Sequence, residues 1–151
     1  MPEYTITDFE DAILAALEPL KATHGVQTLE SYDLHLEDPE VWKKLAIKFP
    51  AIFVLFGSMD TKDNGQRQME SNSFQIGMAD RSLRKGEARR GGAQVGGAYG
   101  LIDGVRKALA GKILLPDMTP IMPRSVRQVV IADGVAMYAA TYTIGQGYLI
   151  P

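Results

Sequence analysis

The chain has 151 residues, of which 46% are hydrophobic and 23% charged, proportions typical of one globular domain with a single core. Its formal net charge of -2 excludes a strongly basic nucleic-acid-binding protein, because affinity for a polyanion requires a large positive field. The sequence contains no cysteine, which excludes a disulfide framework and a thiolate zinc site. No apolar run approaches the roughly 20 residues that span a bilayer, and acidic residues precede the first apolar run, so neither a membrane span nor a secretion signal is expected.

The first predicted element is an amphipathic helix over residues 7–21. Thr7 and Glu10 have the spacing of a capping box, in which each side chain bonds to the backbone N–H of the other residue. Apolar residues then recur at helical spacing, and this stripe consists of Phe9, Ile13, Ala16, Leu17 and Leu20.

A short strand, a second helix and a buried strand are expected next. Residues 29–34 suit a short strand, and Asp38 followed by Pro39 favours a helix start because proline fits the first helical position. The apolar stripe of this helix consists of Val41, Leu45 and Phe49. Pro50 blocks its continuation, and the apolar run at 51–56 is typical of a central strand covered on both faces.

Two polar segments flank the following strand, and both are predicted to be flexible loops. Residues 60–68 contain Asn64-Gly65, a dipeptide common in turns, and should connect two antiparallel strands. Residues 84–93 are rich in basic residues and glycine, so they bury too little apolar surface to offset their ordering entropy. Between these loops, the strand should turn one face to the core, on which lie Phe74, Ile76 and Met78.

The remaining sequence predicts one helix and one hairpin. The helix ends near Gly111, and its apolar stripe consists of Tyr99, Ile102, Val105 and Leu109. Residues 124–132 and 135–144 are β-rich runs on either side of Asp133-Gly134, the strongest short hairpin signal in the sequence.

The order of these elements predicts the fold class. Helix, strand, helix, two strands, helix and two strands follow one another without an internal repeat. This pattern favours an α/β (α+β) fold in which helices flank a mixed, mostly antiparallel sheet of about five strands. We expect the whole of residues 1–151 to form one domain.

The residue types that carry chemistry do not form a recognisable catalytic, cofactor or metal site. The glycines at 91, 92, 96, 97 and 100 lack the spacing of a nucleotide-binding loop, and their more frequent role is loop flexibility and close helix packing. His24 and His35 are the only histidines and stand alone, so a metal site or catalytic triad has too few partners. An enzyme remains a rival hypothesis, for which only the charged pair Asp80 and Arg81 offers a polar pocket.

Large apolar residues at two places are candidates for a subunit interface. Trp42 is expected to be either a core residue or an interface anchor, since large aromatic side chains dominate both kinds of packing. The segment near the C-terminus places Tyr148, Leu149 and Ile150 together, and such an apolar segment favours burial against another subunit.

Five segments, in the order in which they occur, resemble one protein family. They are EDAILAAL, KFPAIFVLFG, FQIGMADRSLR, GGAYGLIDGVRKALAGK and PRSVRQVVIADGVAMYAATYTI. Together they cover nearly the whole chain and resemble the Mu-like prophage tail proteins regarded as tail terminators. The motifs are patterns of packing and loop sequence, so their shared order carries the resemblance.

The resemblance implies a non-enzymatic structural protein. It implies a homo-oligomeric ring, a hexamer, that caps the tail tube, stops its polymerisation and provides the surface for joining the head. The expected partners are the tail tube protein and a head-completion or connector protein, without membrane or sequence-specific nucleic-acid binding, although phage DNA would pass through the ring. The expected location is the host cytoplasm during assembly and then the virion tail.

Basic residues on the two predicted loops are the candidate contacts with these partners, because loops held by a rigid core commonly carry recognition. They are Arg67, Arg84, Lys85, Arg89 and Arg90. Any one of them could instead be an ordinary solvated surface charge. The alternative functions are a head-completion or connector protein, a minor tail protein and, from a different class, the small enzyme considered above.

Overall fold

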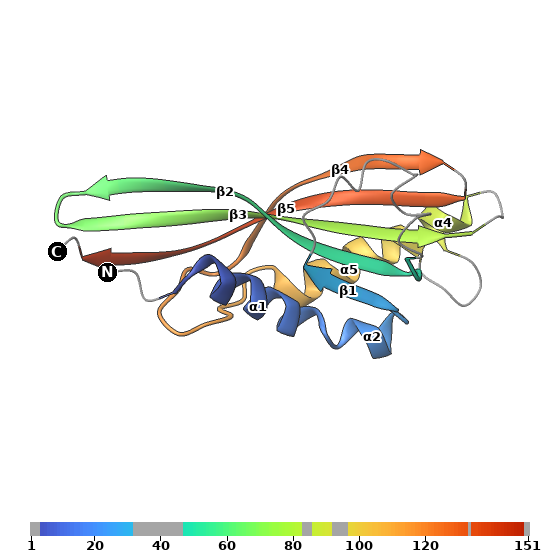
Figure 1. The fold of residues 1–151 in the computed structure, drawn as a ribbon, viewed down its shortest axis with the longest axis horizontal. Helices are drawn as coiled ribbons and strands as arrows, with labels where there is room; N and C mark the ends of the chain where they lie inside the picture. Colours follow the sequence, from blue (N-terminus) through green and yellow to red (C-terminus); the bar gives the residue numbers. More distant parts are fainter. Residues whose placement is uncertain (1–3, 32–46, 83–85, 92–96, 133, 150–151) are drawn as a thin grey trace.

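Five strands form one mixed sheet. The computed structural model describes residues 4–31, 47–82, 86–91, 97–132 and 134–149. The strands lie in the order β1-β2-β3-β5-β4, and every neighbouring pair is antiparallel except β1 and β2 (Figure 1). Their bounds are β1 Thr28–Ser31, β2 Ala51–Asn64, β3 Arg67–Arg81, β4 Met122–Ala132 and β5 Val135–Leu149. The predicted α+β fold with a mixed, mostly antiparallel sheet is confirmed.

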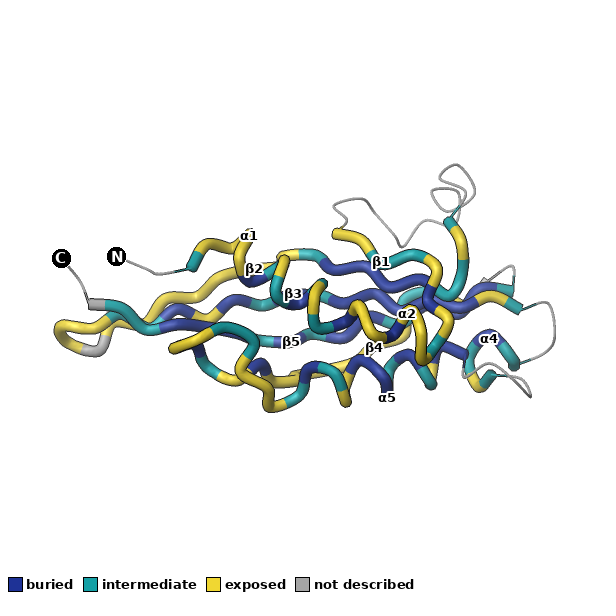
Figure 2. Tube along the Cα trace, turned by 90° about the horizontal axis from the view of Figure 1, so that it is seen from below, coloured by how far each residue is buried: buried dark blue, intermediate teal, exposed yellow. Residues whose placement is uncertain are grey.

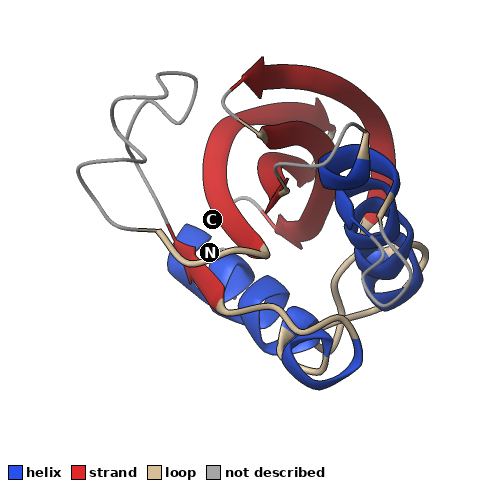
Figure 3. Cartoon of the chain, turned by 90° about the vertical axis from the view of Figure 1, so that its right-hand side faces the viewer, coloured by secondary structure: helices blue, strands red, loops and turns tan. Residues whose placement is uncertain are grey.

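Helices pack on one side of this sheet, which is strongly twisted when viewed end-on (Figure 3). The two long helices are α1 (Ile6–Leu17) and α5 (Gly97–Leu109), and the two short ones are α2 (Leu20–Thr23) and α4 (Glu87–Arg90). The apolar stripe of α1 faces the sheet, as its spacing predicts, with Phe9, Ile13 and Leu17 buried. In α5 the predicted Val105 and Leu109 are buried, but Leu101 takes the place expected for Tyr99 and Ile102, and Tyr99 is exposed.

The ends of α1 differ from the prediction. The capping box consists of Thr5 and Asp8 rather than Thr7 and Glu10: the Thr5 N–H donates to Asp8 Oδ2 at 2.8 Å, and the Asp8 N–H donates to Thr5 Oγ1 at 3.1 Å. The predicted helix over 7–21 is also divided, because Pro19 has no N–H with which to continue the ladder. The chain therefore resumes as the separate α2.

The main core lies between the sheet and the helices. The central strands contribute side chains at alternate positions, so the predicted core face of β3 is confirmed, and Figure 2 shows the buried residues concentrated along the middle of the sheet. The fully buried large side chains of the sheet in this cluster are Ile52, Phe74, Ile76, Met78 and Ile144. The opposite face carries a smaller cluster built from Ala51, Phe53, Ala79, Val135 and Met137.

One end of the sheet projects past the helices as a three-stranded extension (Figure 1). We call this extension the arm, and it comprises residues 58–64 of β2, 67–73 of β3 and 143–149 of β5. The prediction of a loop over 60–68 was wrong, since β2 continues to Asn64 and β3 begins at Arg67. The expected link between antiparallel strands is confirmed, and it is a tight turn in which Gly65 has φ +74°.

Part of the second predicted loop is also regular structure. Within 84–93, residues 87–90 form the short helix α4, which begins after Gly86 in the left-handed region, at φ 77°. Several predicted features fall outside the described residues: the helix expected after Asp38 up to residue 46, the second half of the strand expected at 29–34, His35 and the turn residue Asp133. The antiparallel pairing of β4 with β5 confirms the predicted hairpin.

Candidate functional site

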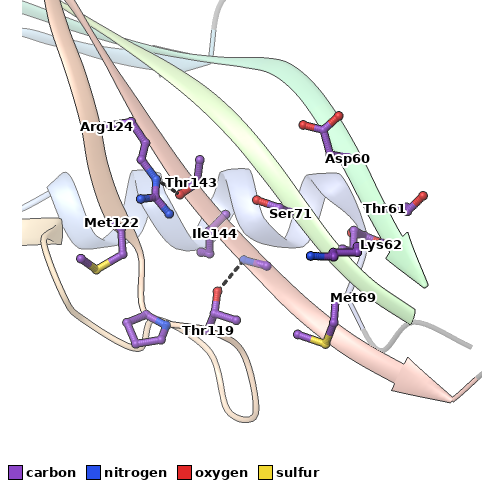
Figure 4. A pocket seen from close by; sticks show the side chains of 13 residues that line it. Asp60, Thr61, Lys62, Met69, Ser71, Thr119, Met122, Arg124, Thr143 and Ile144 are labelled. Carbon is purple, nitrogen blue, oxygen red and sulfur yellow. Dashed lines mark hydrogen bonds between the residues drawn. The ribbon is translucent and has the colours of Figure 1, made fainter. Parts of the chain in front are cut away.

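A groove lies on the arm. It has a volume of about 460 Å³ and lies on the face of the sheet opposite the helices, between the β2 side of the arm and the start of β4 (Figure 4). Its lining combines charged, hydroxyl and apolar side chains, among them Asp60, Lys62, Met69, Ser71, Met122, Arg124 and Thr143. The ionisable side chains of the lining are the carboxylates of Asp60 and Glu70 and the cationic groups of Lys62 and Arg124.

Hydrogen bonds fix the β4 side of the groove. Arg124 lies at an irregularity in the β4–β5 pairing, and its Nε donates to Thr143 Oγ1 at 2.8 Å. The segment before β4 is tied to β5 by two bonds: the Gly145 N–H donates to Thr119 Oγ1 at 2.9 Å, and the Thr119 N–H donates to the Gly145 carbonyl at 2.9 Å. A side chain at Gly145 would collide with the Glu70 carbonyl, so only glycine fits this approach.

Behind the groove, on the helix-bearing side, lies a buried polar cluster. Glu70 Oε1 accepts from Asn72 Nδ2 at 3.0 Å and from Gln146 Nε2 at 3.3 Å, and these three residues are at most 7% exposed. The Gln146 side chain also binds both backbone groups of Tyr4, because its Oε1 accepts from the Tyr4 N–H and its Nε2 donates to the Tyr4 carbonyl. The cluster therefore anchors the segment before α1 to the arm.

The predicted partner-contact residues do not form one patch. Arg67 is exposed at the start of β3, beside the turn at the tip of the arm, and its guanidinium lies over Gly147. Arg89 and Arg90 belong to α4, at the other end of the molecule (Figure 1). Arg84 and Lys85 lie outside the described residues. The three predicted contacts that lie in the described residues thus occupy two opposite ends of the molecule.

The predicted interface residues are placed only in part. Tyr148 and Leu149 form the end of β5 and pair with the start of β3, which makes this apolar segment part of the arm. The Tyr148 hydroxyl donates to Gln68 Oε1 at 2.6 Å, and Tyr148 is half-buried. Trp42 and Ile150 lie outside the described residues.

Aromatic and acidic groups occur near α4 at the far end. Tyr99 and Tyr138 form an edge-on pair with ring centroids 5.7 Å apart, and burial, followed by the hydrogen bond and charge interaction with Tyr99, raises the pKa of Tyr138. Asp80, which the rival enzyme hypothesis singled out, is 5% exposed and accepts a hydrogen bond from the Arg81 N–H at 2.8 Å. Burial raises the pKa of Asp80, and the Arg81 hydrogen bond partly opposes that increase.

No cluster of three or more histidine, aspartate or glutamate side chains in the described part of the chain could hold a metal ion. No helix in the described ranges has the length and apolar character needed to cross a membrane. His24, which the sequence left without a role, packs its ring over Gly104 of α5, while its Nδ1 lies 2.7 Å from Thr23 Oγ1.

The family model described as Bacteriophage Mu, Gp37 matches residues 5–147, nearly the entire chain. The chain belongs to this family. A chain in the solved structure titled "Virion of native gene transfer agent (GTA) particle" shares the fold, with a TM-score of 0.60 and 12% sequence identity, over 97% of this chain and 100% of that chain. No curated protein matches. The chain is thus a member of a phage Mu protein family, and its fold also occurs in a chain of a virion particle.

Sequence reasoning missed the groove and the polar cluster. The groove is formed by strands far apart in the sequence, so no local motif marks it. The cluster left a weak local signal, because Glu70 and Asn72 occupy the same alternating face as Phe74. The two glycines that flank Gln146 are a further signal: one lies against the Glu70 carbonyl and the other against the Arg67 and Met69 side chains.

Proposed function

We propose that the protein forms a hexameric ring that caps the tail tube, stops tube polymerisation and presents the surface to which the filled head is joined. Membership of the Mu Gp37 family over residues 5–147 is the observation that carries this proposal. The shared fold with a chain of a virion particle supports it. The partners would be the tail tube protein and a head-completion protein, in the host cytoplasm and then in the virion tail.

The elongated shape suits a subunit with two different partners. The tip of the arm carries Arg67, and the opposite end carries α4 with Arg89 and Arg90 (Figure 1). Tube growth repeats one heterologous interface, so a ring that matches the last tube layer on one side and differs on the other removes the next addition site. The two basic ends would then contact the tube and the head-completion protein separately.

Electron microscopy of particles from a deletion strain tests this function. Tails without the protein should overgrow or fail to join heads, and complementation with the natural chain should restore both length and joining. Tails of normal length that attach to heads in the deletion strain would overturn the proposal and favour a connector or an enzyme.

Charge reversals at the two ends refine the test. Arg67→Glu, and separately the pair Arg89→Glu and Arg90→Glu, should each impair one of the two phenotypes, tail length or head joining, but not both. Lys107→Glu on the exposed face of α5 is a matched control expected to leave both unchanged. If one variant that still folds lost both the control of tail length and head joining, the result would contradict the division of partners between the two ends.

A further inference from the structure

The sheet has two outer edges that no described strand covers completely. On one side, β1 pairs only with Ala51 to Val54, so residues 55–64 of β2 have a described strand on one side only. On the other side, β4 is the last strand of the sheet along its whole length. Strands that end a sheet present backbone groups that another strand can pair with.

Both edges carry exposed apolar side chains. On β2 these are Phe56 and Met59, which are 37% and 45% exposed. On β4 they are Met122, Val126 and Ile131, of which Val126 is 41% exposed. Exposed apolar residues along an unpaired edge favour contact with another chain.

The charges on the two edges are complementary. β4 carries Arg124 and Arg127, both exposed, and has no acidic residue. The uncovered part of β2 carries Asp60 and Asp63, with one cation, Lys62, between them. The basic edge of one copy can therefore face the acidic edge of an identical copy. Because the two edges are different parts of the same chain, such a contact is head-to-tail.

Strand directions permit this contact. β2 and β4 run antiparallel within the sheet, because each of the three intervening pairings reverses the direction. If neighbouring copies are related by rotation about an axis roughly along the strands, the strand directions do not change between copies. β4 of one copy then lies antiparallel to β2 of the next copy. Rotations of this kind close into a ring.

The register of the contact follows from the covered part of β2. Within one copy, Val126 pairs with Ala140, Ala140 pairs with Ile76, and Ile76 pairs with Val54, so Val126 and Val54 lie at the same height in the sheet. On its other side, Val54 already pairs with β1. A neighbouring β4 displaced by about five residues, or about 16 Å, places Val126 opposite Met59 and residues 123–130 opposite residues 55–62, next to the part of β2 that β1 covers. Across four strand spacings of about 4.8 Å, this displacement corresponds to a strand tilt of about 40°, within the range of closed barrels.

Side chains match at this register. Val126 falls opposite Met59, and both project from the helix-bearing face, since they pair within their own sheets with Ala140 and Asn72 of that face. Arg124 falls beside Asp60 on the opposite face, at the two rims of the groove. The groove would thus complete its charge pairing across the subunit boundary.

We infer that the ring is closed by antiparallel pairing of residues 123–130 of β4 from one copy with residues 55–62 of β2 from the next copy. This inference rests on the proposed function, and it names the surface through which the subunits associate. Its occupant is a second copy of this chain, and the apolar pair Val126 and Met59 together with the ion pair Arg124 and Asp60 specify the register.

Charge exchange between the edges tests the pairing. The variant Arg124→Glu with Arg127→Glu, and the variant Asp60→Lys with Asp63→Lys, should each associate at least roughly tenfold more weakly than the natural chain in sedimentation equilibrium. An equimolar mixture of the two variants should recover association, because acidic β4 then meets basic β2 in alternate contacts. Arg106→Glu with Lys107→Glu on α5 is the control and should associate like the natural chain. Equal association of all variants would overturn the pairing.

Cross-linking tests the register and also works in assembled tails. The chain lacks cysteine, so Met59→Cys and Val126→Cys introduce the sole thiols. A short bis-maleimide should link the two variants to each other in a mixture, and should link neither variant to itself, nor either one to Lys107→Cys. Absence of the mixed cross-link in tails of normal length would overturn the edge pairing and leave the capping function standing. Links within a single variant would indicate a two-fold contact and would also overturn it.

Discussion

Asp80 illustrates how a single buried charge can set the pH dependence of stability. The side chain is 5% exposed, and the hydrogen bond from the Arg81 N–H only partly offsets the loss of hydration. The pKa of Asp80 in the folded protein is therefore raised above the ordinary value of 3.8. The folded state binds this proton more tightly than the unfolded state, so the contribution of Asp80 to stability falls as pH rises from 3.8 through the raised pKa.

We expect Asp80→Asn to stabilise the protein at neutral pH by on the order of 1 kcal/mol, because the amide avoids burying a charge while its oxygen still accepts from the Arg81 N–H. The gain should vanish below pH 3.8, where Asp80 is protonated in both states. Urea denaturation of both proteins across a pH series measures the difference. Asp103→Asn on the exposed face of α5 is the control. A constant difference at every pH would show that Asp80 does not titrate with folding.

Some residue-level features were predictable because they depend on local alternation or spacing. Phe74, Ile76 and Met78 alternate along the chain, and their burial follows from the geometry of a strand. The positions of Glu70 and Gln146 were not predictable, since their mutual hydrogen bond joins residues separated by 76 positions. The candidate site was therefore the least predictable part, and of the five predicted partner contacts only Arg67 lies on the arm.

At the scale of elements, β2 and β3 show why the lengths of strands were underestimated. The apolar run at 51–56 identified the covered half of β2, but the arm half is polar and carries Asp60, Lys62 and Asp63. The arm half of β2 lies outside the core and needs no alternating apolar residues, because its backbone N–H and C=O groups form hydrogen bonds with β3. An apolar sequence pattern indicates burial. It therefore predicted only the buried part of β2.

The turn of the arm should depend on glycine for backbone reasons alone. Gly65 has φ +74°, and no atom lies within 4 Å of an added Cβ, so Gly65→Ala should destabilise the protein by about 1 kcal/mol through the left-handed conformation. Gly100→Ala is the control with the opposite expected sign. Gly100 lies in α5, and an added Cβ there also meets no atom within 4 Å, so this variant should stabilise the protein by about 0.5–1 kcal/mol. Thermal unfolding of the two variants measures both changes. Changes of the same sign would contradict the backbone explanation.

At the scale of the whole molecule, uncovered edges connect stability to association. Copies that pair through β4 and β2 bind only in the folded state, so mass action raises the apparent stability of the fold as protein concentration increases. The two edges lie on opposite sides of the same sheet. In the proposed ring, each copy would therefore contribute to two contacts.

We expect the midpoint of thermal unfolding to rise with protein concentration for the natural chain. The variant Arg124→Glu with Arg127→Glu should unfold at a midpoint that changes less with concentration, since it associates more weakly. Differential scanning calorimetry over a hundredfold concentration range makes the comparison. A midpoint independent of concentration in the natural chain would contradict self-association under these conditions.

The position of β5 has a consequence for the timing of synthesis. β5 follows the other four strands in the chain, yet it lies between β3 and β4 in the sheet, and Gln146 near its end holds Tyr4 at the other end of the described chain. Until the ribosome releases that segment, β4 has no neighbour within its own chain and the first helix lacks its anchor. Because domains complete folding only when all their strands are available, a nascent chain cannot present both ring edges in their final arrangement. In the proposed ring, a chain could therefore take its place only after β5 has been made.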